Sequence, residues 1–287
     1  GFLLKSGKKI SPVTLAYETY GRLNADKSNA VLVAHALSGD AHAAGAHEGE
    51  KAPGWWDSTI GPGKAIDTEK YFVVCSDCIS NINYNSPTVI TTGPASINPE
   101  TGKPYGMSFP IFTLDDVVML QRKLIDHLGI KKLRFVMGPS MGGLQAYLWS
   151  KYFPEMVEKI IAVVATPMVR PACLMVPNQL GIEAIMLDSR WQNGDYYGQE
   201  APIKGLLLAF KMLLTATRTD HWAETCFGRK VPDPFFLTTE NPALSFKGRF
   251  LVEEGIEQSV VTRMQYFDPN AYIYIAKANT LFDLCQP

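Results

Sequence analysis

Residues Leu133–Gly143 read Leu-Arg-Phe-Val-Met-Gly-Pro-Ser-Met-Gly-Gly, and this stretch decides the fold. Its first six residues form a short apolar run that predicts a buried strand, and the residues after Ser140 predict a helix. Between the two elements, Gly138–Gly142 match the pattern G-x-S-x-G, in which a serine stands at a sharp turn from strand to helix. We therefore predict that Ser140 is a nucleophile. The alternative is a glycine-rich turn with a capping serine.

Other short apolar or β-rich runs surround this stretch and predict further strands: Val13–Tyr20, Ala30–His35, Tyr71–Ser76 and Lys159–Ala165. A helix is predicted to begin at the N-cap Thr113 and to close at Gly129, with apolar residues at helical spacing between them. Strands that alternate with helices in this way indicate an α/β fold with a mostly parallel sheet.

The pattern changes between Pro167 and Asp268, where no core strand is evident. Residues 178–187 and 204–217 look helical, and residues 240–264 look helical or mixed. We predict that residues 1–166 form the α/β core, that residues 167–268 form a mainly helical lid insertion, and that residues 269–287 return toward the core.

A second turn follows the predicted strand Ala30–His35. The residues His35-Ala36-Leu37-Ser38-Gly39 of this turn have a His-x-x-x-Gly pattern that resembles the oxyanion loop of α/β hydrolases. This resemblance implies that the backbone N–H of Leu37, together with the N–H of Met141, forms an oxyanion hole beside Ser140. His35 is expected to brace the turn rather than to act as a base. His42 and His47 follow nearby, but their spacing is not that of metal ligands, so no metal site is predicted.

Composition excludes several classes of protein. The 287 residues carry a net charge of -1 and no basic stripe, which argues against a nucleic-acid partner. No apolar run approaches the roughly 20 residues that span a membrane. The five cysteines are an odd and small number, which favours reduced thiols in the cytoplasm. Cys75 and Cys78 form C-x-x-C, for which we prefer a buried strand end over a redox pair or half of a zinc site.

Several motifs together resemble the homoserine O-acetyltransferase family, whose members have the α/β-hydrolase fold. The motifs are Leu15–Gly21, His35–His42, Gly54–Trp56, Thr91–Pro99, Thr101–Gly106, Ser140–Gly143, Tyr152–Pro154, Arg218–Asp220 and Phe267–Tyr272. They occur in family order over nearly the whole chain. Two stretches depart from the family pattern: Pro139 stands where the family usually has glycine, and Asn81–Val89 replaces a glycine-rich loop. We therefore expect a divergent member.

The resemblance implies a reaction. Ser140 would take an acetyl group from acetyl-CoA, a substrate, with no cofactor, and would pass it to the hydroxyl of homoserine or a related acceptor in methionine synthesis. Arg218 matches the family arginine that holds the carboxylate of the acceptor, a role that suits a guanidinium. The resemblance also implies a homodimer through the lid helices.

The rest of a catalytic triad is not predicted from this chain. In the α/β-hydrolase fold an acid and a histidine follow the serine in chain order, but the single histidine after Ser140 is His221, in the lid. We expect the last core strands, with the acid and the histidine, to be missing from the sequence. Two alternatives stay open: an ester hydrolase of the same fold, and a catalytically incomplete, truncated product that keeps only the fold.

Overall fold

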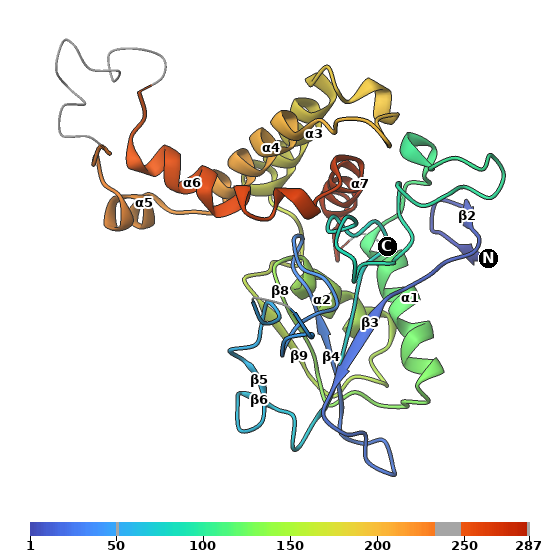
Figure 1. Ribbon diagram of the computed structural model, residues 1–287. Helices are drawn as coiled ribbons and strands as arrows, with labels where there is room; N and C mark the ends of the chain where they lie inside the picture. Colours follow the sequence, from blue (N-terminus) through green and yellow to red (C-terminus); the bar gives the residue numbers. More distant parts are fainter. Residues whose placement is uncertain (50–51, 233–247, 286–287) are drawn as a thin grey trace. The chain divides into compact units, whose positions relative to one another are not determined.

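The computed structural model describes residues 1–49, 52–232 and 248–285. The chain divides into two compact units (Figure 1). Unit 1 comprises Gly1–Arg170 and Tyr266–Pro287, and unit 2 comprises Pro171–Gln265. The sequence-based domain boundaries, after residues 166 and 268, differ from these limits by a few residues and stay predictions.

A five-stranded sheet lies at the centre of unit 1, in the order β3-β7-β4-β8-β9. These strands are β3 (Tyr17–Tyr20), β4 (Ala30–Ala34), β7 (Phe72–Ser76), β8 (Val136–Pro139) and β9 (Ile160–Val163). All neighbours are parallel except β3, which pairs antiparallel with β7. Every residue of β4 is buried, as expected for a central strand covered on both faces. The predicted α/β fold with a mostly parallel sheet is confirmed.

The first strand is shorter than the predicted Val13–Tyr20. The N–H of Thr14 donates to the hydroxyl of Thr92, and the N–H of Ala16 donates to the hydroxyl of Thr91. Because these backbone groups bond to side chains of one loop, the regular ladder with β7 begins only at Tyr17.

Two helices cover one face of the sheet: α1 (Leu114–His127) and α2 (Met141–Tyr152) (Figure 1). Thr113 caps α1 with a capping box closed by Asp116, as the sequence predicts for the N-cap. The two helices are joined by a buried hydrogen bond from Gln121 Nε2 to Gln145 Oε1 at 2.7 Å. Gln121 also donates to Ser76 Oγ at 3.4 Å, which places α1 over β7.

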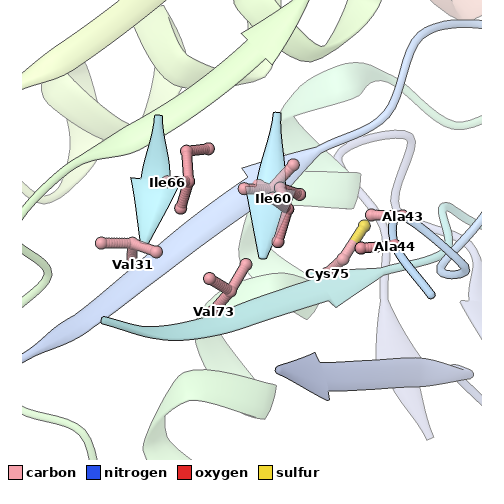
Figure 2. Close-up of a cluster of buried hydrophobic side chains, with 8 residues drawn as sticks. Val31, Ala43, Ala44, Ile60, Ile66, Val73 and Cys75 are labelled. Atoms are coloured by element: carbon pink, nitrogen blue, oxygen red, sulfur yellow. The ribbon is translucent and has the colours of Figure 1, made fainter. Parts of the chain in front are cut away.

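An apolar cluster covers the opposite face (Figure 2). Val31 and Val33 of β4 and Val73 and Cys75 of β7 are fully buried there. The cluster is completed by Ala43, Ala44, Ile60 and Ile66. The last two belong to β5 (Ile60–Gly61) and β6 (Ile66–Asp67), a short parallel pair that lies over the sheet. Successive residues of β4 and β7 therefore face opposite sides of the sheet, one covered by α1 and α2 and the other by the apolar cluster.

The remaining elements of unit 1 are small or terminal: β1 (Phe2–Leu3), β2 (Lys9–Ile10), the 3-10 turn Gly106–Ser108 and α7 (Pro269–Thr280). A further 3-10 turn, Met264–Tyr266, spans the boundary between the two units. Asp268 caps α7, accepting a hydrogen bond from the N–H of Ala271. The hydroxyl of Tyr274 on α7 donates to the carbonyls of Met107 and Phe109 at 2.9 and 2.5 Å, which ties this helix to the core of unit 1.

Within the described residues of unit 2, the regular elements are all helices, joined by turns and loops. Unit 2 contains a π-helical turn (Pro171–Met175), a 3-10 turn (Gln192–Gly194) and the helices α3 (Val176–Leu187), α4 (Ile203–Ala216), α5 (Asp220–Cys226) and α6 (Leu251–Val261). The predicted helices over residues 178–187 and 204–217 are confirmed as α3 and α4. Of the predicted stretch 240–264, residues 240–247 lie outside the described residues. Over the part of the chain that the structure describes, no helix is long and apolar enough to cross a membrane.

Candidate active site

Ser140 occupies a strained turn at the carboxyl end of β8. Its backbone angles are φ 50° and ψ -117°, a region that side chains other than glycine rarely adopt. The N–H of Ser140 donates to the carbonyl of Val163 at 2.9 Å, and its carbonyl accepts from the N–H groups of Gly143 and Leu144. These three bonds fix the turn, and they leave the side chain of Ser140 exposed. The geometry is that of a nucleophile elbow.

The glycines of the motif are required by close backbone contacts. A β-carbon on Gly138 would lie 2.5 Å from the carbonyl oxygen of Ala34, and one on Gly142 would lie 2.1 Å from the same atom. A β-carbon on Gly143 would lie 2.5 Å from the β-carbon of Ala165. The end of β4 and the start of α2 therefore approach more closely than any side chain allows. Pro139, the departure from the family pattern, is accommodated as the last residue of β8.

Both predicted oxyanion donors lie at this edge of the sheet. Met141 is the first residue of α2, and Leu37 belongs to the segment 35–41, which follows β4 and which we call the β4 loop. Within residues 1–49, 52–232 and 248–285, neither the N–H of Leu37 nor that of Met141 donates a hydrogen bond. The N-terminus of α2 also carries the positive end of the helix dipole. Unbonded donors at a helix N-terminus suit a developing negative charge.

A buried polar network holds the β4 loop. Asp77 Oδ1, directly after β7, accepts from the N–H of Ala41 at 2.7 Å and from Asn81 Nδ2 at 3.3 Å. Asn81 Nδ2 also donates to the carbonyl of Gly39. Asn83 Nδ2 donates to the carbonyl of Ser38 at 3.1 Å and to that of Gly39 at 3.0 Å. The β4 loop, which carries Leu37, is thus held by the side chains of Asp77, Asn81 and Asn83, each of which is at most 2% exposed.

Burial changes the ionisation of two groups in this region. It raises the pKa of Asp77 to about 7, although hydrogen bonds from Thr91 and the N–H of Ala41 favour the charged form. Burial also lowers the pKa of His35, whose Nδ1 lies 2.7 Å from the carbonyl of Ala36. Burial therefore favours the neutral form of His35, and its ring contact with Ala36 lies within the β4 loop that it is expected to brace.

No general base is assigned to Ser140. Across the described residues, no hydrogen bond reaches the Ser140 hydroxyl. His221, the histidine that follows Ser140 in the sequence, lies on α5 of unit 2, where it is exposed.

Arg218 lies between α4 and α5 in unit 2. It is exposed, and its guanidinium stands over the ring of Trp222, 5.2 Å from the centroid. Its role in binding a carboxylate stays a prediction.

Cys75 and Cys78 are both fully buried, and burial raises the pKa of each thiol. The preferred interpretation of C-x-x-C, a buried strand end, is confirmed. Protonated, inaccessible thiols are inert, which argues against the redox alternative.

Comparison with known proteins places these features in a family. A homoserine O-acetyltransferase of Methanohalobium evestigatum is 47% identical over 284 residues, covering 99% of this chain and 56% of the relative. A homoserine O-acetyltransferase of Deferribacter desulfuricans is 46% identical over 99% of this chain and 72% of the relative. The chain belongs to the homoserine O-acetyltransferase family. It spans little more than half the length of the first of these relatives. No protein-family model matches it.

Solved structures support the same family and its α/β-hydrolase fold. The crystal structure of homoserine O-acetyltransferase from Bacillus anthracis has a TM-score of 0.90 and 41% identity, over 98% of this chain and 74% of that one. Esterase E22 has a TM-score of 0.88 and 38% identity, over 98% of this chain and 76% of that one. Structures named as transferase and as esterase are therefore similar to the chain to almost the same degree.

Sequence reasoning missed the network below the β4 loop. Its members are Asp77, Asn81 and Asn83. A signal was present, because Asn81–Val89 was noted as a departure from the glycine-rich family loop. The two asparagines at the start of this segment, Asn81 and Asn83, donate hydrogen bonds to carbonyls of the β4 loop.

Proposed function

We propose that this protein transfers an acetyl group from acetyl-CoA to the hydroxyl of homoserine or a close relative of it, through an ester on Ser140. The observation that carries the proposal is the elbow geometry of Ser140, exposed beside the unbonded N–H groups of Leu37 and Met141. Membership of the homoserine O-acetyltransferase family supplies the acyl group and the acceptor.

The proposed reaction has two halves. In the first, Ser140 Oγ attacks the thioester carbonyl, the carbon–sulfur bond breaks, and the CoA thiol leaves with a proton. In the second, the hydroxyl oxygen of the acceptor attacks the ester carbonyl, and the proton of that hydroxyl returns to Ser140 Oγ. Both steps pass through a tetrahedral oxyanion, which the N–H groups of Leu37 and Met141 would stabilise. The reaction itself needs no cofactor.

Arg218 would bind the carboxylate of the acceptor. A guanidinium presents two parallel N–H donors to a carboxylate, which an ammonium does not. Arg218→Lys should therefore raise KM for homoserine by about tenfold or more and leave KM for acetyl-CoA unchanged. Arg134→Lys is the matched control, because Arg134 is an exposed arginine of unit 1 that pairs with Glu158.

Transfer is distinguished from hydrolysis by where the acetyl group goes. Beyond the first equivalent released when Ser140 is acylated, release of free CoA thiol should depend on homoserine, and O-acetylhomoserine should form in equal amount to this further release. A second candidate, ester hydrolysis, is favoured by the similarity to esterase E22. It predicts thiol or alcohol release that is independent of homoserine, with acetate as the product.

We further propose that the enzyme acts in the cytoplasm as a homodimer joined through unit 2, with no nucleic-acid partner. Exposed apolar side chains on α3 and α4 support this contact: Leu187 is 85% exposed and Leu208 is 50% exposed. Light scattering on the wild type and on Leu208→Glu should give a dimer and a monomer, respectively.

A further inference from the structure

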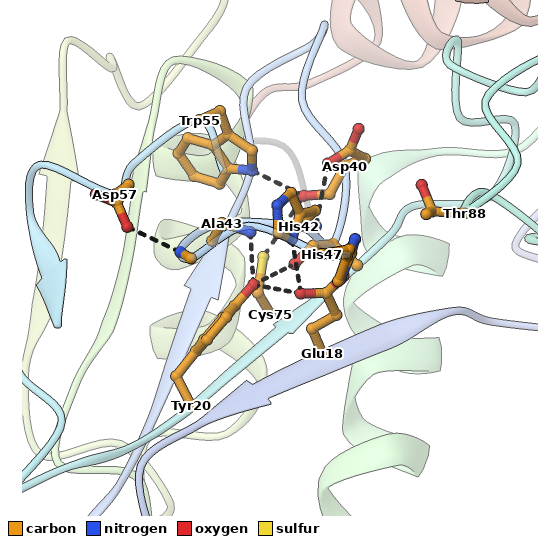
Figure 3. A network of polar contacts seen from close by, with 12 residues as sticks. Glu18, Tyr20, Asp40, His42, Ala43, His47, Trp55, Asp57, Cys75 and Thr88 are labelled. Carbon is orange, nitrogen blue, oxygen red and sulfur yellow. Dashed lines mark hydrogen bonds and ion pairs between the residues drawn. The ribbon is translucent and has the colours of Figure 1, made fainter. Parts of the chain in front are cut away.

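Three side chains that can bind a metal converge on the side of the sheet where β3 lies (Figure 3). Glu18 belongs to β3, whereas His42 and His47 follow the β4 loop. His42 Nδ1 lies 3.0 Å from Glu18 Oε2, and His47 Nε2 lies 3.0 Å from Glu18 Oε1. One donor atom from each of the three residues lies within 4.8 Å of the other two. The two imidazole rings are 4.0 Å apart.

These separations suit a small divalent ion. Zinc binds histidine nitrogen and carboxylate oxygen at about 2.0–2.2 Å, so that two ligands in a tetrahedron stand about 3.3 Å apart. Each imidazole nitrogen lies 3.0 Å from a different oxygen of Glu18, and one donor atom from each residue lies within 4.8 Å of the others, so small side-chain movements would bring three ligands to that spacing. The side chains of His42, Glu18 and His47 are 13%, 24% and 42% exposed, so water can reach a fourth position.

The surrounding contacts orient the ligands. Tyr20 donates its hydroxyl to Glu18 Oε2 at 2.7 Å and accepts from the N–H of Ala43 at the same distance. The N–H of His42 donates to Asp40 Oδ1 at 3.0 Å. Hydrogen bonds to a ligating carboxylate, such as that from Tyr20, orient ligands in known metal sites, and the bond from the His42 N–H fixes the backbone that carries this imidazole.

The three donors are displaced from Ser140 across the width of the sheet. In the sheet order, β7 and β4 stand between β3 and β8, and the residues that hold Ser140 do not include any of the three donors. The two donor segments are also far apart in the chain, with 23 residues between Glu18 and His42. An ion bound here would therefore join β3 to the segment after the β4 loop.

We propose that Glu18, His42 and His47 form a structural binding site for a divalent transition-metal ion of the zinc type. The donor set, two imidazoles and one carboxylate, selects zinc, cobalt or nickel over magnesium or calcium, which prefer all-oxygen sites. The alternative is that the two imidazoles hydrogen-bond to the carboxylate and bind no metal.

Cobalt(II) is the probe that separates the two. Metal-free protein is titrated with Co²⁺ and the visible absorption bands are followed, with zinc then added in competition. We expect one equivalent to bind, and zinc to displace it. The exposed cysteines Cys173, Cys226 and Cys285 are a rival site, but a thiolate ligand adds strong near-ultraviolet absorption that a nitrogen and oxygen site lacks.

Three variants test the ligands: Glu18→Gln, His42→Gln and His47→Gln. Each should weaken binding at least tenfold, whereas His127→Gln, which removes an exposed histidine on α1, should leave binding unchanged. As a second readout, zinc should raise Tm of the wild type and of His127→Gln but not of the three ligand variants. Because each Tm shift is measured against the same variant without metal, a destabilised variant still gives an answer.

Two results would overturn the proposal. One is the absence of stoichiometric cobalt and zinc binding to the wild type. The other is binding that survives in both His42→Gln and His47→Gln. Either would leave Glu18, His42 and His47 as a hydrogen-bonded cluster alone.

Discussion

The carbonyl oxygen of Ala34 lies so close to Gly142 that a β-carbon on Gly142 would stand 2.1 Å from it. This contact joins the last residue of β4, from which the β4 loop departs, to the first turn of α2, which begins at the nucleophile elbow. The position of the proposed oxyanion donor Leu37 relative to the other proposed donor, Met141, therefore depends on the absence of a side chain at Gly142.

Gly142→Ala should disrupt the elbow. Alanine ordinarily stabilises a helix relative to glycine, by up to about 1 kcal/mol. Here we expect destabilisation, because the added methyl must displace the Ala34 carbonyl. Activity should fall by about 100-fold or more, as when an oxyanion donor is lost. Urea unfolding and steady-state kinetics measure the two effects.

The control for this substitution is Gly63→Ala. Gly63 lies in an exposed turn with nothing within 4 Å of an added β-carbon, and the cost there comes only from its φ of 69°. It should lower stability by about 1 kcal/mol and leave kcat unchanged. Equal activity of Gly142→Ala and Gly63→Ala would show that the close approach of the Ala34 carbonyl to Gly142 is not needed for activity.

Asp77→Ala should be much worse than Asp77→Asn. Removal of the carboxylate leaves buried donors from Ala41, Asn81 and Thr91 without an acceptor, each at a cost of about 1–3 kcal/mol. Asparagine keeps one acceptor oxygen for the first two, and its amide can donate to the Thr91 hydroxyl. Chemical denaturation of both variants checks this ranking. Similar stabilities would show that the network contributes little.

The same carboxyl gives a pH dependence with a definite sign. Burial raises the pKa of Asp77 to about 7 from its ordinary value of 3.8. Between those values the folded protein holds a proton that the unfolded chain has released, so the free energy of unfolding falls as pH rises. The difference in stability between wild type and Asp77→Asn should therefore shift against the wild type between pH 4 and pH 7. A pH-independent difference would contradict the raised pKa.

Asn83→Ala should slow catalysis without weakening substrate binding. Its amide holds the carbonyls of Ser38 and Gly39, next to the proposed donor Leu37. A loosened β4 loop would misplace that N–H in the transition state, so kcat should fall by roughly tenfold while KM changes little. Asn98→Ala is the comparison, because Asn98 is half-buried in a turn where its side chain accepts from the N–H of Glu100. A rise in KM with constant kcat would place Asn83 in substrate binding instead.

Local patterns predicted the elements that position Ser140. The apolar run before it, the glycines around it and the cap at Thr113 each depend on residues near one another in the chain. The cap is as predicted, whereas the strand predicted over Leu133–Gly138 spans Val136–Pro139. The start of β3 was not predictable in this way, because the partners of Thr14 and Ala16 are side chains at Thr91 and Thr92.

The polar clusters could not be predicted from local sequence patterns for the same reason. His42 and His47 alone lack ligand spacing, and their third partner, Glu18, comes from an earlier strand. Asp77 and Asn83 act on the β4 loop across the sheet edge, more than 35 residues earlier in the chain. Residues that are brought together only by the order of strands in the sheet produce no periodic pattern in the sequence.

The most direct test of this account uses the protein at the length at which the organism makes it. The mass of the intact protein is measured after incubation with acetyl-CoA. The account predicts a gain of about 42 Da, one acetyl group, mapped to Ser140 by peptide analysis, absent from Ser140→Ala and removed on addition of homoserine. A folded wild-type protein that turns over acetyl-CoA but never carries the acetyl group on Ser140, or whose Ser140→Ala variant is labelled equally, would contradict it.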